Sequence, residues 1–254
     1  MGIPERSYYE IRENWERLTL TPALRAKLDV LRALVPSGVR RVLDLGCGNG
    51  VLTNELAREY SIVGLDWSHA ALGFVSAPRL CASSAAVPLR AGAFDLILCS
   101  ELLEHLVEAD FHATIQEMLR LDACYLLLSV PNRENLHINE VRCPECRFIF
   151  NASHHQRSFS PESLAAGFAG YRVRDVRVGG TPVRDYPVEL LRLRQRIGGR
   201  WFQVPDSRVL LCPACGNKRF PRVRHNPISF YFDLLNRFIS RRRPYWLFVL
   251  LERE

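Results

Sequence analysis

The sequence is poor in lysine, in methionine and in long apolar runs. Only Lys27 and Lys218 are lysines and only two residues are methionine, so arginine supplies nearly all of the positive charge. No apolar run reaches the roughly 18–20 residues that a membrane-spanning helix needs. The first residues are charged and polar and lack the apolar segment of a secretory signal. These absences predict a soluble protein of the cytoplasm.

The composition excludes several classes of protein. Of the 254 residues, 48% are hydrophobic and 24% are charged, which argues against a disordered chain, a collagen-like fibre and a coiled coil. The length suits one α/β domain with an elaboration, or two small domains. We find no internal repeat and no low-complexity tract.

The net charge of +7 is distributed unevenly. Residues 1–129 contain 12 basic and 16 acidic side chains, whereas residues 130–254 contain 22 and 11. A basic second half favours acidic partners such as nucleic acid, a phosphorylated substrate or anionic lipid head groups. An excess of arginine over lysine can also reflect the base composition of a genome, so the charge alone does not select a partner.

Strands and helices are expected to alternate through the first half of the chain. Thr21 can cap a helix that begins at Pro22. Apolar runs typical of buried strands, separated by helical stretches, then predict a parallel sheet covered by helices on both faces. Strands are predicted at 41–45, 61–65, 79–82, 94–99 and 124–130, and helices at 51–59, 68–74, 102–106 and 110–121.

The alternation of strands and helices breaks after Pro131. Two long stretches beyond this proline have the character of insertions into the sheet, and shorter strand and helix patterns separate them. In chain order we expect an insertion at 132–158, a helix from 161 to about 169, a strand at 171–178, a second insertion at 180–243 and a last strand at 245–251.

Residues 228–239 form an aromatic, amphipathic pattern that precedes Arg241, Arg242 and Arg243. We expect this helix to pack on the sheet ahead of the last strand. A helix that lies on a membrane surface has the same pattern and is the alternative.

A glycine-rich turn stands between the first predicted strand and its helix, in the run Asp44-Leu45-Gly46-Cys47-Gly48-Asn49-Gly50. Glycines at such a turn permit positive φ angles and let a ligand approach backbone N–H groups. Asp66 ends the next predicted strand, where a ribose diol needs an acceptor. A dinucleotide fingerprint requires glycine or alanine five residues after its first glycine, and Val51 at this position argues against NAD.

Three stretches resemble class I S-adenosylmethionine-dependent methyltransferases. They are VLDLGCGNG at 42–50, VPLRAGAFDLILCSELLEHL at 87–106 and LLLSVPNREN at 126–135. The resemblance covers roughly residues 38–131 and, with the last two strands, most of the chain. It implies a Rossmann-like seven-stranded sheet that is mostly parallel with an antiparallel last strand, and S-adenosylmethionine as the cofactor.

The resemblance also implies roles for single residues near the glycine turn. Asp44 would meet the ammonium group of the cofactor, directly or through water. Asp66 would hold the ribose hydroxyls, with Trp67 beside the adenine. Gly46, Gly48 and Gly50 would line the methionine moiety, and Cys47 and Asn49 between them would also bind the cofactor.

Two further pairs of residues complete the implied cofactor site. Ser83, followed by Ser84, stands where the family often has an aspartate for the adenine amine, so a hydroxyl or backbone contact would have to substitute. Ser100 and Glu101 leave the fourth strand where the sulfonium and the substrate should meet.

Three histidines are candidates for proton transfer. His105 matches a residue that is common in the family and serves in some members as a base, in many only as part of the pocket. His154 and His155 lie in HHQRSFSPESL, which resembles a segment of zinc-bearing relatives. For this pair a structural role is at least as well supported as a catalytic one.

Four of the eight cysteines form two Cys-Pro-x-Cys turns. Such turns place two thiolates on one side, and two of them complete a tetrahedral zinc site. The insertions that carry them should both emerge at the ligand-binding edge of the sheet and could be joined there by one structural zinc. Two disulfides or four unrelated thiols are the alternatives. The predicted ligands are Cys143, Cys146, Cys212 and Cys215.

The expected domain organisation follows from these assignments. An N-terminal helical cap, in which Tyr8, Tyr9 and Trp15 either fold over the cofactor or belong to the core, precedes the cofactor-binding core. Two insertions form a zinc-binding lid, and the remaining segments return to the core sheet. The boundaries are 1–37 for the cap, 38–131 for the core, 132–158 and 180–243 for the lid, and 159–179 and 244–254 for the return.

The sequence therefore predicts a methyltransferase that acts on an oxygen or nitrogen of a small or medium organic substrate, such as a sugar or a biosynthetic intermediate. Two alternatives stay open: an RNA methyltransferase whose arginine-rich lid grips phosphates, and a non-catalytic binding protein with the cofactor fold. Peripheral contact with a membrane is a further option for the basic second half. The sequence does not indicate the oligomeric state.

Overall fold

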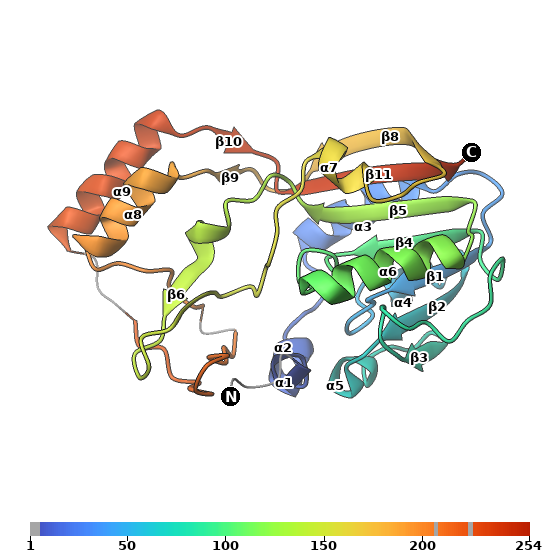
Figure 1. Ribbon diagram of the computed structural model, residues 1–254, viewed down its shortest axis with the longest axis horizontal. Coiled ribbons are helices and arrows are strands. Elements are labelled where there is room, and N and C mark those ends of the chain that lie inside the picture. Colours follow the sequence, from blue (N-terminus) through green and yellow to red (C-terminus); the bar gives the residue numbers. More distant parts are fainter. Residues whose placement is uncertain (1–5, 206–207, 223–225) are drawn as a thin grey trace.

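A seven-stranded sheet forms the centre of the molecule in the computed structural model, which describes residues 6–205, 208–222 and 226–254 (Figure 1). The strand order is β3-β2-β1-β4-β5-β11-β8, and all neighbours are parallel except β11, which is antiparallel to β5 and β8. The predicted mostly parallel sheet with an antiparallel last strand is confirmed. The strands are β1 (Arg41–Leu45), β2 (Ser61–Asp66), β3 (Arg79–Cys81), β4 (Leu96–Ser100), β5 (Tyr125–Pro131), β8 (Tyr171–Gly179) and β11 (Trp246–Arg253).

Helices cover both faces of this sheet. The apolar sides of α3 (Pro22–Leu34), α4 (Thr53–Leu56) and α5 (His69–Leu72) pack on one face. Those of α6 (Glu108–Arg120) and α7 (Pro161–Ala165) pack on the other. Such two-sided cover explains why the central strands are continuous apolar runs rather than alternating ones.

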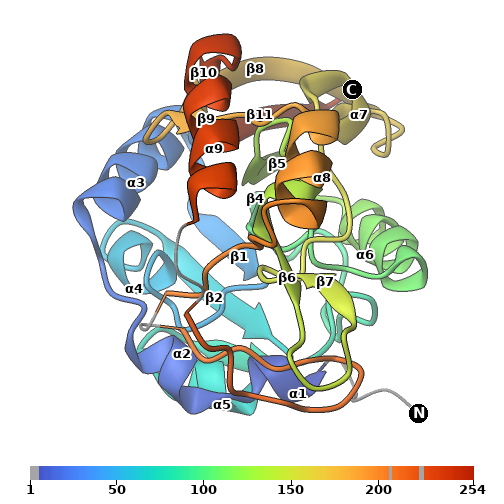
Figure 2. The same ribbon diagram turned by 90° about the vertical axis from the view of Figure 1, so that its left-hand side faces the viewer.

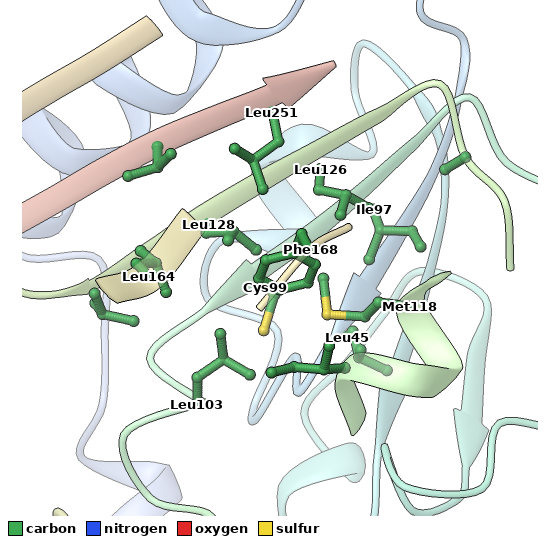
Figure 3. Close-up of a cluster of buried hydrophobic side chains, with 14 of the residues drawn as sticks. Leu45, Ile97, Cys99, Leu103, Met118, Leu126, Leu128, Leu164, Phe168 and Leu251 are labelled. Carbon is green, nitrogen blue, oxygen red and sulfur yellow. The ribbon is translucent and has the colours of Figure 1, made fainter. Parts of the chain in front are cut away.

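The two faces are supplied by alternate residues of the same strands. In β4, Leu96 and Leu98 point to the face under α3, whereas Ile97 and Cys99 point to the face under α6. Figure 3 shows the apolar cluster under α6, where Met118 of that helix lies among side chains from several strands. This period of two places almost every central side chain in one of the two cores.

The start of α3 follows the local rules that the sequence predicts. The Thr21 hydroxyl accepts a hydrogen bond from the Leu24 N–H at 3.2 Å, and Pro22 occupies the first helical turn. Leu28, Leu31 and Leu34 are then buried on one side of the helix. The cap therefore sets where the helix begins, and the leucines set which side faces the sheet.

Residues 102–106, predicted as a helix, form a turn instead. The carbonyls that a helix would use are taken by another segment: Arg157 donates to the oxygens of Leu103 and Leu106, and the Gln156 N–H donates to Glu104 at 2.7 Å. Tertiary hydrogen bonds thus replace the helical ones. Three other predicted helices, at 51–59, 68–74 and 161–169, are shorter than expected and end in turns.

A pair of helices projects beyond the carboxyl ends of the strands (Figures 1 and 2). It consists of α8 (Val188–Arg196) and α9 (Pro227–Ile239), which pack on each other. The short strands β9 (Val183–Arg184) and β10 (Arg242–Arg243) pair and connect them to the core.

The prediction that residues 228–239 pack on the sheet is wrong. The buried side of α9 presents polar groups, among them Ser229 and Asn236. The Asn236 amide donates to the Asp185 carbonyl and the cap residue Asn226 donates to the Gly198 carbonyl, so this side meets the loops that flank α8 rather than an apolar sheet. Its apolar side chains remain largely exposed.

The first insertion contains a short 3₁₀ helix, η1 (Leu136–Asn139), and a hairpin of β6 (Glu140–Arg142) and β7 (Ile149–Asn151). It meets the N-terminal helices α1 (Arg6–Tyr9) and α2 (Arg12–Glu16). A third, small core joins these parts and the second insertion; it comprises Tyr8, Ile11, Val141, Ala152, Leu210 and Leu211. Within the described ranges, no helix combines the length and apolarity that crossing a bilayer requires.

The packing of the sheet gives a direct test. Leu98 of β4 is 1% exposed between the sheet and α3, and Leu98→Ala removes apolar contacts and leaves a cavity. We expect the free energy of unfolding to fall by about 2–5 kcal/mol, measured by chemical denaturation. In the matched control Val178→Ala, at a half-exposed position of β8, it should change by less than about 1 kcal/mol. Equal effects of the two substitutions would contradict this description of the core.

Candidate active site

A cavity of about 520 Å³ opens at the carboxyl ends of β1, β2 and β4. This volume is in the range of small-molecule sites, and the edge of the sheet is where α/β proteins bind ligands. Eleven of the twelve residues predicted to bind the cofactor line it. They are Asp44, Gly46, Cys47, Gly48, Asn49, Asp66, Trp67, Ser83, Ser84, Ser100 and Glu101.

Gly50 is the predicted residue that does not line the cavity, and its role is in the turn. Gly46, Gly48 and Gly50 have φ angles of +80°, +53° and +73°, which other residues rarely adopt. A Cβ on Gly46 would lie 2.8 Å from a Leu102 methyl, and one on Gly48 would lie 3.0 Å from the Trp15 ring. A side chain at either of these two glycines would therefore collide with the neighbouring residues that line the cavity.

Asp66 connects the glycine turn to the turn after β2. Its two carboxylate oxygens accept hydrogen bonds from the N–H groups of Gly48 and Ser68, both at 2.9 Å. Burial raises the pKa of Asp66, although these N–H groups oppose the shift. The carboxylate still borders the cavity, so it can accept hydrogen bonds from a ligand.

Asp44 lies deeper, at the end of β1. It is 3% exposed and accepts a hydrogen bond from the Thr53 hydroxyl at 2.6 Å. Burial raises its pKa to about 6. A cationic group entering the cavity would favour the ionised form of this carboxylate.

The serines at the end of β3 are only partly available to a ligand. The Ser84 hydroxyl lies 2.9 Å from that of Thr114, and the Ser83 hydroxyl accepts from the Ala85 N–H at 3.2 Å. Ser100, in contrast, has a buried hydroxyl without a hydrogen-bond partner among the described residues. It borders the cavity at the end of β4.

The sequence did not identify Lys27, which also borders the cavity. Its ammonium group is buried, lies 3.0 Å from a carboxylate oxygen of Glu101 and sits 4.9 Å from the centre of the Trp246 ring. Glu101 itself has a φ of +56°, a strained angle of the kind that often marks functional sites. The available signal was a lone lysine on the apolar side of a predicted helix, beside Leu28.

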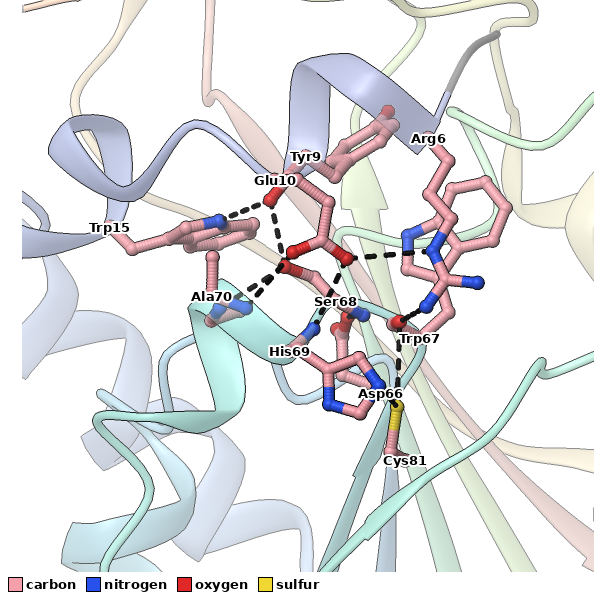
Figure 4. Close-up of polar contacts among 11 residues, drawn as sticks. Arg6, Tyr9, Glu10, Trp15, Asp66, Trp67, Ser68, His69, Ala70 and Cys81 are labelled. Carbon is pink, nitrogen blue, oxygen red and sulfur yellow. Dashed lines mark hydrogen bonds and ion pairs between the residues drawn. The ribbon is translucent and has the colours of Figure 1, made fainter.

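The N-terminal segment is bound across the turn after β2 (Figure 4). Arg6 donates to the Trp67 carbonyl at 2.7 Å. Glu10 accepts from the N–H groups of His69 and Ala70 at 3.2 and 3.1 Å, where its negative charge suits the start of α5.

The same segment supplies part of the cavity wall. The Tyr9 carbonyl accepts from the Ser68 hydroxyl at 2.7 Å and from the Trp15 indole N–H at 2.6 Å. Tyr8, Tyr9 and Trp15 all line the cavity. Tyr8 also belongs to the small third core. The segment therefore both borders the cavity and packs in a core, the two roles between which the sequence did not decide.

The structure brings His105 and His155 together but gives His154 a separate place. The rings of His105 and His155 meet edge to face at 4.6 Å, and His105 lines the cavity. The His154 ring instead packs on Tyr8 at 4.0 Å, and burial lowers its pKa to about 4.

Glu134, which the sequence did not single out, holds His155 in place. Its carboxylate makes a short hydrogen bond to Nδ1 of His155, and both side chains are 5% exposed. The other carboxylate oxygen accepts from the Asn139 amide at 3.1 Å. His155 is therefore backed by a buried carboxylate that orients its ring.

A second buried carboxylate lies beside the histidines. Neither oxygen of the Glu104 side chain has a hydrogen-bond partner among the residues that the structure describes, and burial raises its pKa well above the usual range. Burial also lowers the pKa of His105 well below its usual value. One donor atom each from Glu104, His105 and His155 lies within 4.8 Å of the others, a spacing that suits a bound metal ion.

The four predicted cysteine ligands also come together. All four sulfur atoms lie within 4.8 Å of one another, with Cys143 3.6 Å from Cys215 and Cys146 3.6 Å from Cys212. A zinc ion with four bonds of roughly 2.3 Å places its sulfurs about 3.8 Å apart. The cysteines are free thiols in the structure, at separations well beyond a disulfide bond. The geometry thus fits a metal better than the disulfide alternative.

The two cysteine turns share one backbone pattern. The N–H of Arg147 donates to the Cys143 carbonyl at 3.1 Å, and that of Gly216 donates to the Cys212 carbonyl at 2.9 Å. Arg147 and Gly216 both have left-handed φ angles, +65° and +76°. An arginine at this position suits the turn less well than glycine, yet it adopts the same conformation.

Comparison with known proteins places this geometry in a family. The family model described as "Methyltransferase domain" matches residues 9–173. Curated relatives include "Ubiquinone biosynthesis O-methyltransferase" of Ralstonia nicotianae, 32% identical over 90 residues, and the protein of the same name from Rhizobium rhizogenes, 38% identical over 85. These matches cover 31% and 29% of this chain, and the chain spans little more than a third of either relative, 38% and 34%.

Solved structures have the same fold. A SAM dependent methyltransferase from Archaeoglobus fulgidus superposes with a TM-score of 0.51 at 16% identity, over 90% of this chain and 94% of that chain. A SAM-dependent methyltransferase from Methanosarcina mazei gives 0.52 at 15% identity, over 93% and 99%. The chain therefore belongs to the methyltransferase domain family, and this domain is of the class I, S-adenosylmethionine-dependent type.

Proposed function

We propose that the protein transfers the methyl group of S-adenosylmethionine to a hydroxyl oxygen of a small organic molecule. One observation carries this proposal: the glycine turn, Asp66 and His105 border a single cavity, and His105 is backed by His155 and Glu134. The name of the curated relatives, an O-methyltransferase, supports oxygen over nitrogen as the acceptor.

The cofactor would be held by the residues at the ends of β1 and β2. Gly46 and Gly48 leave room for its methionine part, and the Asp44 carboxylate offers a partner for the ammonium group. Asp66 can accept from the ribose hydroxyls, with Trp67 beside the adenine. When bound, S-adenosylmethionine supplies an already activated methyl donor.

The chain's own residues then have two tasks. The first is to hold the acceptor in line with the methyl group, and positioning of this kind contributes up to about 7–11 kcal/mol in model systems. The second is to receive the hydroxyl proton. His105 suits this task because it lines the cavity and its burial keeps the ring neutral near pH 7, so that the imidazole can accept a proton.

His155 and Glu134 would assist without touching the substrate. When His105 gains a proton, the Glu134 carboxylate behind His155 would compensate part of the new charge, and its short hydrogen bond fixes which His155 nitrogen carries the hydrogen. They are positioning residues in this proposal. His154, outside the cavity wall and packed on Tyr8, is assigned to the structure of the lid.

A structural zinc ion would hold the lid over this cavity. The thiolates of Cys143 and Cys146 belong to the first insertion and those of Cys212 and Cys215 to the second. Close to the second pair, Arg208 lines the cavity and donates to the Tyr8 hydroxyl at 2.8 Å. The metal would thereby fix the wall opposite the sheet, which selects the substrate.

A labelling assay distinguishes the proposed function from the RNA alternative. Under the proposal, protein incubated with methyl-labelled S-adenosylmethionine and fractionated cell extract should transfer label to small molecules. An RNA methyltransferase would label RNA and would bind it with a steep dependence on salt. The non-catalytic alternative predicts cofactor binding with no transfer at all.

The first prediction concerns the cofactor. Asp66→Ala should weaken the binding of S-adenosylmethionine and of its demethylated product by about tenfold or more, because a buried charge-assisted hydrogen bond is lost. Isothermal calorimetry measures both affinities. Asp175→Ala, a change of a partly exposed carboxylate on β8, is the control and should leave them unchanged. Wild-type affinity in a folded Asp66→Ala protein would refute the assigned role.

The second prediction concerns the metal. Protein purified without added zinc should contain about one zinc ion per chain by elemental analysis, because a four-thiolate site is closed and tight. Cys146→Ser and Cys215→Ser should each contain less than half of that amount. Cys124→Ser, at an exposed cysteine outside the cluster, should retain it. Metal-free wild-type protein that is as stable as the isolated holoprotein would exclude a structural zinc.

The third prediction concerns the base. With an acceptor identified by the labelling assay, His105→Gln should lower kcat by about 10²–10⁴-fold, the usual contribution of general base catalysis, and leave cofactor affinity intact. Glu134→Gln should lower kcat less. It should also shift the acidic limb of the pH profile of kcat to lower pH, since the His105 imidazolium loses a compensating negative charge. The exposed pair of His112 with Glu108 offers His112→Gln as a control without effect. An unchanged kcat in His105→Gln would show that the enzyme works by positioning alone.

A further inference from the structure

Helix α9 turns its polar side toward the protein and its apolar side outward, the reverse of an ordinary surface helix. Its polar stripe, Ser229, Asp233 and Asn236, has the spacing of one helix face and points inward. Ser229 and Asn236 are 0% and 5% exposed. This inward orientation means that burial of apolar surface against the body of the protein does not explain where the helix lies.

Specific polar contacts hold α9 in this orientation. Asp233 forms an ion pair with Arg194 of α8 at 2.6 Å, and the Asn236 amide donates to the Asp185 carbonyl at 3.1 Å. The helix begins with a capping box in which Asn226 accepts from the Ser229 N–H at 2.8 Å, and the same side chain donates to the Gly198 carbonyl at 2.7 Å. Rotation of α9 to bury its apolar side would break these bonds.

The outward face of α9 is consequently aromatic and aliphatic. Phe238, Tyr231 and Phe230 are 79%, 62% and 60% exposed, and Leu234 lies between them along the helix. Ile228 and Ile239, at its two ends, are about half exposed as well. A monomeric protein rarely presents such a continuous apolar face, which ordinarily marks an interaction surface.

Exposed positive charge follows the C-terminal end of this face. The acidic residues of 184–200 and 226–243 are Asp185, Glu189 and Asp233, and each is engaged by an arginine. Arg237, Arg241 and Arg242 are exposed, and no carboxylate among the described residues lies within ion-pair distance of them. The occupant of the surface must therefore be apolar in its interior and negatively charged at its boundary.

We propose that the outward face of α9, with Arg237, Arg241 and Arg242, docks the protein on the surface of an anionic phospholipid bilayer. An interfacial helix of this kind buries its aromatic side chains at the boundary of the acyl chains while its cations meet the head groups. A second copy of the chain fits less well, because a symmetric contact would bring the same three arginines of both copies together.

Docking on this face would place the bilayer at the side of the molecule where the carboxyl ends of the strands lie. The α8–α9 pair lies beyond the carboxyl ends of the strands (Figure 1), the same edge of the sheet at which the cavity opens. The wall of that cavity includes Arg208 and Trp246, from the segments before α9 and after it. Binding to a bilayer is a property of this surface and does not depend on the proposed methyl transfer.

The test is co-sedimentation of the full chain with vesicles, without any substrate. Wild-type protein should bind vesicles of equal parts phosphatidylcholine and phosphatidylglycerol at low salt, and at least about tenfold less to phosphatidylcholine alone or in roughly 0.5 M NaCl. Absence of binding to the anionic vesicles would overturn the proposal.

Variants test whether vesicle binding depends on this face of α9 or on nonspecific adsorption of the protein. Phe230→Ser with Phe238→Ser should weaken vesicle binding at least about tenfold, since two side chains no longer enter the bilayer. The matched control, Val173→Ser with Val178→Ser on exposed positions of β8, should bind as the wild type does. Calorimetry with S-adenosylmethionine verifies that both proteins are folded. Equal binding by the two double variants would refute the assigned surface.

The charges and the oligomeric state complete the test. Arg237→Gln with Arg241→Gln and Arg242→Gln should remove most of the preference for phosphatidylglycerol and leave the residual binding insensitive to salt. In sedimentation velocity, the wild type and the Phe230→Ser, Phe238→Ser protein should have the same mass in solution. Dimerisation that these phenylalanine changes abolish, without vesicle binding by the wild type, would assign the face to self-association and exclude the bilayer.

Discussion

The two hydrogen bonds that Asp66 accepts are the interaction on which the rest of the site depends. They hold the glycine turn after β1 against the turn after β2, and each of these turns carries a further structure. The first can form only because its glycines adopt positive φ angles beside Leu102 and Trp15. The second begins α5, and the N-terminal segment binds to it through Glu10. One buried carboxylate thus joins a strand end, a helix start and a distant segment of the chain around the cavity.

The opposite wall is assembled from segments that are far apart in the sequence. Val209 exchanges two hydrogen bonds with Asn14, and the cysteines of the two insertions converge at one point. No strand of the main sheet contributes to these contacts, so their stability must come from a small core, a few polar bonds and the proposed metal ion. Small structural units of this kind commonly need such a crosslink. Under the proposed function, the cofactor would bind to residues on rigid strands, whereas the substrate would meet a wall of joined loops.

Much of the fold and of the candidate site could be predicted from the sequence because the relevant signals are local. Strand runs such as 41–45, the Thr21 cap, the glycine turn and the Cys-Pro-x-Cys spacing each state a short-range preference that the fold retains. The errors have a different origin. Residues 102–106 lose their helix to hydrogen bonds from Arg157, and α9 turns its polar side inward to meet Arg194. Glu134 acquires its place only from tertiary packing. For Lys27 the sequence offers a lysine on the apolar side of a helix, but the partner Glu101 is 74 residues away and is found only in the fold.

The position of β11 has a consequence for how the protein is made. Strand β8 pairs with β11 and, within the described sheet, with no other strand. When Gly179 leaves the ribosome, residues 180–245 must still be added before its partner exists, which takes roughly 3–13 seconds at about 5–20 residues per second. During this interval β8 is an unpaired edge, the state in which nascent sheets aggregate. Its arginines at 172, 174 and 177 supply the charge that discourages such association.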